Sequence, residues 1–182
     1  RIEDENGNIL VPADFLYLAK QLKLYSTLSL RMIEKTLEKM KGTEHCVCIN
    51  FDKEDISNAK LQERLFSLID EYQLQGRITI EITESEGIDN LDELTAFVAK
   101  AKQKGCLIAL DDFGTGYSNF MYILSLQPDF LKIDGSITKM ITTSVRARLL
   151  TDAITHMCYL ADIKTVAEYV CTEDIHDTVK DI

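Results

Sequence analysis

The sequence has little of what several kinds of site and partner require. Its 20 basic residues are outnumbered by 30 acidic ones, so the formal net charge is -10. A protein that binds duplex nucleic acid by neutralising phosphates needs a basic surface, so this balance argues against that class. A small phosphorylated ligand held through metal ions is compatible with the charge.

Long apolar runs and targeting segments are also missing. No stretch approaches the roughly eighteen apolar residues that cross a membrane, and no signal peptide opens the sequence. The chain begins at Arg1 without methionine, so we expect residues 1–182 to be most of a single domain excised from a longer, multidomain protein. A membrane anchor or a sensor domain elsewhere in that parent protein is compatible with the sequence.

Cysteine and histidine offer little for a zinc site. Cys46 and Cys48 form a C-x-C pair, but no second pair lies at the spacing of a zinc finger, and the three histidines add no ligand pattern. The number of cysteines, five, is odd, and three of them lie in apolar strand-like runs, where cysteine is a small core residue. This usage favours a reducing, cytoplasmic compartment.

Strand-like and helix-like stretches alternate along the chain. The predicted strands cover residues 46–51, 77–83, 106–111, 130–134 and 164–169. Between them, apolar residues at three- and four-residue spacing predict helices over residues 27–40, 59–72, 90–103 and 145–160. Such alternation is typical of an α/β domain with a parallel sheet.

The strands are apolar on one face only. In the run RITIEIT, Ile78, Ile80 and Ile82 share one face, and Thr79, Glu81 and Thr83 share the other. A doubly wound sheet needs apolar residues on both faces, whereas a closed barrel turns one face to its helices and the other to a shared interior. The pattern predicts a TIM-like (β/α) barrel, incomplete at both ends in this chain.

Polar residues follow the carboxyl ends of the predicted strands. They are Asn50, Glu81, Asp111, Asp112, Lys132, Asp134 and Glu168. In a parallel barrel these ends meet at one mouth, where such folds place their chemistry. Carboxylate and amide oxygens suit Mg²⁺ or Mn²⁺, two such ions would activate a water against a phosphodiester, and Lys132 would orient that water.

The run DDFGTGYSN carries the strongest sequence feature. Two adjacent carboxylates, Asp111 and Asp112, end an apolar strand, and two glycines then allow a turn towards a helix that starts at Ser118 or Asn119. Such carboxylates repel each other and lose hydration, so they favour a cation site. Neighbours on a regular strand face opposite ways, so both reach one metal pair only if the backbone leaves the strand there.

Simpler interpretations stay open for single residues. Asn50 would cap the helix after its strand, Glu84 would lie in a solvated turn, and Lys132 would pair only with Asp134. The run DDFGTGYSN itself would be a solvated loop between a strand and a helix. Compatible ligands at the ends of five strands make the joint interpretation as a site the stronger one.

The chain resembles the EAL-domain family of bacterial cyclic di-GMP phosphodiesterases from end to end. The motifs that carry the resemblance are EITES from Glu81, DDFGTGYS from Asp111, LKID from Leu131 and AEYV from Ala167, with weaker support from INFD and VPADF. The resemblance implies hydrolysis of cyclic di-GMP to linear pGpG. It implies these metal ligands: Asn50, Glu81, Asp111, Asp112 and Glu168.

Other roles follow from the same resemblance. Lys132 would assist the nucleophilic water, and Glu84 would steady the loop after Asp112, which in the family contributes to dimerisation. Arg1 aligns with an arginine that touches substrate phosphate, and we expect Asp134 to bind substrate too. A homodimer and sensor or signalling domains in the parent protein are the expected partners besides cyclic di-GMP.

Three departures from the family pattern bear on activity. The name-giving glutamate would lie just before Arg1, and a QGY-like segment would lie beyond Ile182. The usual AEGVE is AEYVC here, with Tyr169 and Cys171 in place of glycine and glutamate. Two alternatives therefore stay open: a weakly active or inactive domain that binds cyclic di-GMP or a partner as a regulatory module, and a barrel enzyme acting on another phosphate ester.

Overall fold

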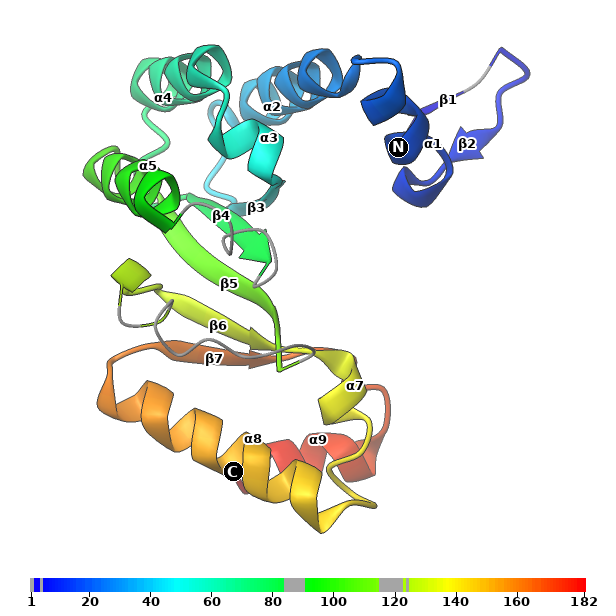
Figure 1. The fold of residues 1–182 in the computed structure, drawn as a ribbon, viewed down its shortest axis with the longest axis vertical. Helices are drawn as coiled ribbons and strands as arrows, with labels where there is room; N and C mark the ends of the chain where they lie inside the picture. The colour runs from blue at the N-terminus through cyan, green and yellow to red at the C-terminus, as the bar shows by residue number, and fades with distance from the viewer. Residues whose placement is uncertain (1, 4, 84–90, 115–122, 124) are drawn as a thin grey trace.

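A five-stranded parallel sheet forms the centre of the computed structural model, which describes residues 2–3, 5–83, 91–114, 123 and 125–182 (Figure 1). The strands pair in chain order and are β3 (Val47–Phe51), β4 (Ile78–Thr83), β5 (Leu107–Phe113), β6 (Phe130–Ile133) and β7 (Lys164–Ala167). A doubly wound sheet reverses its strand order at a switch point, whereas a (β/α) barrel adds each strand beside the last. The barrel-like order is therefore confirmed, with β3 and β7 at the edges of the described sheet.

The four predicted helices are present. They are α2 (Tyr25–Met40), α4 (Ala59–Tyr72), α5 (Leu91–Gln103) and α8 (Val145–Leu160). Asn58 caps α4 by accepting a hydrogen bond from the N–H of Leu61, and Ser144 caps α8 in the same way through Ala147. Figure 1 shows α2 and α4 side by side above the β3 end of the sheet, while α5 packs on β5 and α8 on β7.

Several shorter elements lie outside the predicted ranges. They are the antiparallel pair β1 (Ile2–Glu3) and β2 (Ile9–Leu10), and the helices α1 (Pro12–Gln21), α3 (Lys53–Ile56), α7 (Gly135–Thr138) and α9 (Glu173–Lys180). Two of these helices, α3 and α7, are single turns that directly follow β3 and β6, where they continue the alternation of strand and helix. Within the described ranges, no helix is long and apolar enough to cross a membrane.

The two faces of the sheet differ as predicted. Ile78, Ile80 and Ile82 are 0 % exposed and pack in the same core as residues of α2, α4 and α5. Full burial of such a side chain contributes roughly 1.5–3 kcal/mol, so this face holds the helices on the sheet. Glu81 lies on the opposite face, in register with Asn50 on β3. The apolar layer therefore fixes where the polar side chains point.

The cysteines divide into two groups. Cys106 and Cys158 are buried, and burial raises the pKa of their thiols to about 12 and about 11. Cys46 and Cys48 are exposed, so the prediction that strand cysteines are core residues is wrong for this pair. Cys48 lies on the same face of β3 as Asn50, away from the helices.

Arg77 ties the end of α2 to the start of β4. Its guanidinium donates hydrogen bonds to the backbone oxygen of His45 at 2.8 and 2.9 Å, to Thr43 Oγ1 at 3.0 Å and to the backbone oxygen of Met40 at 3.3 Å. Met40 is the last residue of α2, where carbonyl groups lack partners within the helix. One side chain therefore satisfies the helix end and the loop that leads into β3.

We expect Arg77→Ala to lower the free energy of unfolding by roughly 1–3 kcal/mol, because three acceptors lose a charged donor. Urea denaturation measures the change. Arg64→Ala is the matched control, since Arg64 is exposed and forms an ion pair at 2.8 Å with the surface carboxylate of Glu34. Stability of Arg64→Ala should stay near that of the wild type, and equal losses in the two variants would contradict the role given to Arg77.

Candidate metal centre

An ammonium group surrounded by carboxylates lies at the carboxyl end of the sheet. The Nζ atom of Lys132, on β6, is 2.8 Å from Asp111 Oδ1, 2.9 Å from Glu168 Oε1 and 3.5 Å from Glu81 Oε1. These acids come from β4, from β5 and from the position directly after β7, so four neighbouring strands contribute. The structure thus brings together four of the residues that were predicted for the site.

Burial and charge act against each other at Lys132. The four side chains are only 12–23 % exposed, so water screens their charges weakly. Burial opposes the charged form of Lys132, but its hydrogen bonds to Asp111 and Glu168 outweigh this and raise its pKa. The lysine is therefore held as a cation, and three carboxylates still face one positive charge.

The backbone leaves the regular strand at Asp112. Asp112 has a φ of 56°, in the left-handed region, and the pairing of β5 with β6 shifts register between Leu110 and Phe113. The shift is that of a β-bulge, in which one extra residue on β5 bends the strand and re-aims its side chains. The condition set by the sequence, that both aspartates reach one site only if the strand is interrupted, is met.

The bulge creates a cluster that would accept a divalent cation. One oxygen each of Asp111, Asp112 and Glu168 can be chosen so that all three lie within 4.8 Å of one another. Two oxygens bound to the same Mg²⁺ lie at most about 4.2 Å apart, so small side-chain movements would complete such a site. Burial, followed by the charges of Asp111, Asp134 and Glu168, raises the pKa of Asp112.

The donor set fits Mg²⁺ or Mn²⁺ by its chemistry. All the clustered ligand atoms are carboxylate oxygens, and among the residues that the structure describes this cluster includes neither cysteine nor histidine. Lys132 already supplies a positive charge between Asp111 and Glu168. A cation bound there would compete with that ammonium for the same oxygens.

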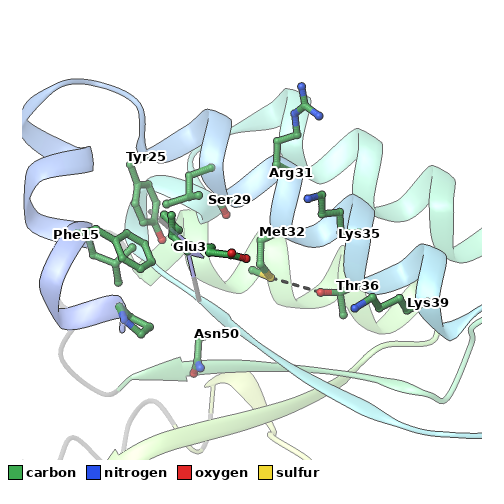
Figure 2. Close-up of a pocket in the computed structure, with 14 residues that line it drawn as sticks. Glu3, Phe15, Tyr25, Ser29, Arg31, Met32, Lys35, Thr36, Lys39 and Asn50 are labelled. Atoms are coloured by element: carbon green, nitrogen blue, oxygen red, sulfur yellow. Dashed lines mark hydrogen bonds between the residues drawn. The ribbon is translucent and has the colours of Figure 1, made fainter. Parts of the chain in front are cut away.

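Asn50 lies at the edge of this group, beside a large pocket. It is in register with Glu81 and borders a pocket of about 830 Å³ whose other walls come mainly from α1 and α2. Figure 2 shows Asn50 on the sheet side of that pocket. The interpretation of Asn50 as a helix cap is wrong, because Asp52 caps α3 through the N–H of Glu54.

The remaining predicted site residues are placed as follows. Asp134 caps α7, and the N–H of Ser136 donates to Asp134 Oδ1 at 2.8 Å. Hydrogen bonds from the hydroxyl of Ser136 and then from this N–H lower the pKa of Asp134. Its carboxylate is also close enough to influence Asp112. Glu84, Arg1 and the predicted helix start at Ser118 or Asn119 lie outside the described residues, so their roles stay predictions.

Two neighbours of the centre were given no role by the sequence analysis. Cys48 adjoins Glu81, and burial, followed by that carboxylate, raises the pKa of its thiol. The alternation of β3, which puts Cys48 and Asn50 on one face, would have found it. Tyr169, noted only as a departure from the family, packs its ring against Gly135 at the start of α7. Nothing in the local sequence links these two positions.

Comparison with known proteins identifies relatives over the whole chain. The EAL domain family profile matches residues 1–182. The chain is 30% identical over 185 residues to Cyclic di-GMP phosphodiesterase PdeF of Escherichia coli (strain K12), which covers 98% of this chain and 25% of that protein. It is 28% identical over 188 residues to Cyclic di-GMP phosphodiesterase PdeB of Shewanella oneidensis, which covers 100% and 22%. The chain thus spans about a quarter of the length of these relatives.

Solved structures share the fold. The FimX EAL domain from Pseudomonas aeruginosa bound to c-di-GMP aligns with a TM-score of 0.91 at 17% identity, over 98% of this chain and 74% of that one. The PaMucR phosphodiesterase in complex with c-di-GMP aligns with a TM-score of 0.88 at 23% identity, over 100% and 76%. The α/β fold with its parallel sheet is therefore that of EAL-domain structures.

In metal-free protein, replacing Asp111 and replacing Asp112 by asparagine should shift the melting temperature in opposite directions. Asp111 accepts a charged hydrogen bond from Lys132, so Asp111→Asn should lower the melting temperature in EDTA at pH 7. Asp112 has a raised pKa, so its ionised form weakens the fold at pH 7, and Asp112→Asn should raise the melting temperature. Asparagine also tolerates the left-handed backbone of Asp112.

The pH dependence provides the control for this pair. A group whose pKa is raised on folding adds stability at low pH and loses it as the pH rises through the folded value. The advantage of Asp112→Asn should therefore vanish below the ordinary aspartate pKa of about 3.9, where the wild-type side chain is protonated too. A gain that persists unchanged at that pH would show that the negative charge of Asp112 is not its cause.

Proposed function

The chain belongs to the EAL-domain family, and on this premise we propose that it hydrolyses one phosphodiester bond of cyclic di-GMP, giving linear pGpG, with Mg²⁺ or Mn²⁺ as cofactor. The activity would lower the level of this second messenger. Both named relatives are called cyclic di-GMP phosphodiesterases, and the PaMucR structure is of a phosphodiesterase in complex with c-di-GMP.

One observation carries the proposal: the carboxylates of Asp111, Asp112 and Glu168 converge on one another, and Lys132 pairs with Asp111 and Glu168. Paired acids are costly to hold together unless a cation uses them. We assign Glu81 and Asn50 to the same centre, because they follow in register on β4 and β3. Five oxygen donors of this kind would suffice for two ions, with water and substrate completing each shell.

The residues of the chain have separate tasks in the proposed reaction. Divalent ions, when bound, would hold the phosphodiester and lower the pKa of the attacking water. Lys132 would donate a hydrogen bond from Nζ to the water, which orients the water, or to a phosphate oxygen, where it offsets negative charge. The water oxygen bonds to phosphorus as the bond from phosphorus to the ribose 3′ oxygen breaks, and one water proton ends on that 3′ oxygen.

Three further residues complete the proposed site. Arg1 would bind a substrate phosphate, Glu84 would steady the loop after Asp112, and Asp134 would contact substrate at the rim. The position of Asp134 at the start of α7 supports this last role, since it lies two residues after Lys132 on the same edge of the sheet.

We place the domain in the cytoplasm, as part of a larger signalling protein. The curated relatives are about four times as long as the matched segment, which supports sensor or other signalling domains in the parent protein. A homodimer is the proposed assembly, and a membrane anchor in the parent protein is compatible with it.

Turnover of cyclic di-GMP by the full-length protein tests the proposal. With Mg²⁺ or Mn²⁺ the wild type should release pGpG, measured by chromatography. Glu81→Ala, Asp111→Ala and Lys132→Ala should each lower kcat by about 10²–10⁴, because each removes a group that acts on the reacting phosphate or its ions. EDTA should abolish the activity of the wild type, and added Mn²⁺ should restore it.

The control is an acid of the same type away from the centre. Asp70→Ala removes a surface carboxylate that pairs with Lys104, and its turnover should equal that of the wild type. Wild-type turnover in Asp111→Ala would overturn the proposal. Tight binding of cyclic di-GMP with no product in either metal would instead favour the regulatory module.

A further inference from the structure

Tyr169 follows the carboxylate of Glu168 directly and has an unusual backbone. Its φ is 53°, in the left-handed region, which a bulky side chain rarely adopts. The residue is 64% exposed, so burial of its ring in the core does not explain why this conformation is kept. Strain of this kind persists only where surrounding contacts enforce it, and it gathers at functional sites.

The contacts that enforce it come from α7. A Cβ atom added at Gly135 would lie 2.1 Å from Tyr169 Cδ2 and 2.9 Å from Tyr169 Cβ, so the ring occupies the space that a side chain there would need. Lys139, at the end of α7, places its Nζ atom 4.1 Å from the centre of the ring, within the range of a cation–π contact. The ring is thus held between the two ends of a one-turn helix.

Glu168, the residue before Tyr169, is hydrogen-bonded to the segment that leads into α7. Its N–H donates a hydrogen bond to the backbone oxygen of Ile133 at 3.1 Å, and its Oε1 accepts one from Lys132. Residues 132–135 therefore contact Glu168 at its backbone and at its carboxylate, and they also contact the ring of Tyr169. A carboxylate flanked in this way has little freedom to turn away from Asp111 and Asp112.

We infer that Tyr169 is a positioning residue: its ring, seated on Gly135, fixes the chain after β7 and so directs the Glu168 carboxylate into the metal centre. The inference rests on the proposed function in one respect, that the centre binds a divalent cation. Residues that orient a ligand from behind commonly change metal affinity by 10- to 100-fold when they are removed. Tyr169 would act through Glu168 and would not touch the ion.

Binding of Mn²⁺ to the full-length protein, measured by calorimetry without nucleotide, tests the inference. Tyr169→Gly suits the left-handed backbone and removes the whole side chain, including the ring, so it should fold and bind Mn²⁺ about tenfold more weakly. Tyr169→Phe keeps the ring and should retain the wild-type affinity. Tyr159→Ala removes an 81% exposed tyrosine of α8 and is the matched control, expected to bind as the wild type does.

A double-mutant cycle tests the contact with Gly135. Gly135→Ala should displace the ring and weaken Mn²⁺ binding to a similar degree, because the added methyl group takes its place. In the Tyr169→Gly background the same substitution should cause little further loss, since no ring remains to be displaced. Independent losses that multiply in the double variant would overturn the inference.

The outcomes separate this inference from the proposed function. Wild-type Mn²⁺ affinity in Tyr169→Gly, even with a changed melting temperature, would overturn the positioning role alone. A wild-type protein that binds no Mn²⁺ would overturn the proposed function and the positioning role together. Turnover of cyclic di-GMP enters neither measurement.

Discussion

The structure depends on how like charges are held together at the end of a parallel sheet. Glu81, Asp111 and Glu168 would repel one another in a region with little water, and the Lys132 ammonium among them makes their proximity tolerable. The same carboxylates supply the oxygen ligands and the negative charge that attracts a cation. Stability without metal and affinity for metal therefore have a common origin.

The geometry that brings these groups together is built from ordinary packing. Isoleucines of β4 bury one face of the sheet under the helices, so alternation turns Glu81 to the other face. Regular alternation would have separated Asp111 from Asp112, and the bulge in β5 removes that obstacle. A strand that was regular to its end would place only one of the two aspartates at the centre.

Much of this arrangement follows from sequence patterns, and the part that does not has a physical reason. Periods of two and of three to four residues predicted the five strands of the sheet and four long helices, because burial of one face imposes those periods. The pair β1 and β2, with two residues each, and the one-turn helices α3 and α7 are too short to show a period. The backbone conformation at Asp112 was not predicted either, because its positive φ occurs where the pairing of β5 with β6 shifts register.

The site shows the same division. Alternation and strand ends brought Glu81, Asp111, Lys132 and Glu168 to one place, but the link between Tyr169 and Gly135 joins residues far apart in sequence. That link has a consequence for the evolution of related sequences. A ring at position 169 is compatible only with the smallest residue at position 135, whereas glycine at 169 would release position 135 to vary. The two positions should therefore covary among relatives, and a designer who changes one must choose the other with it.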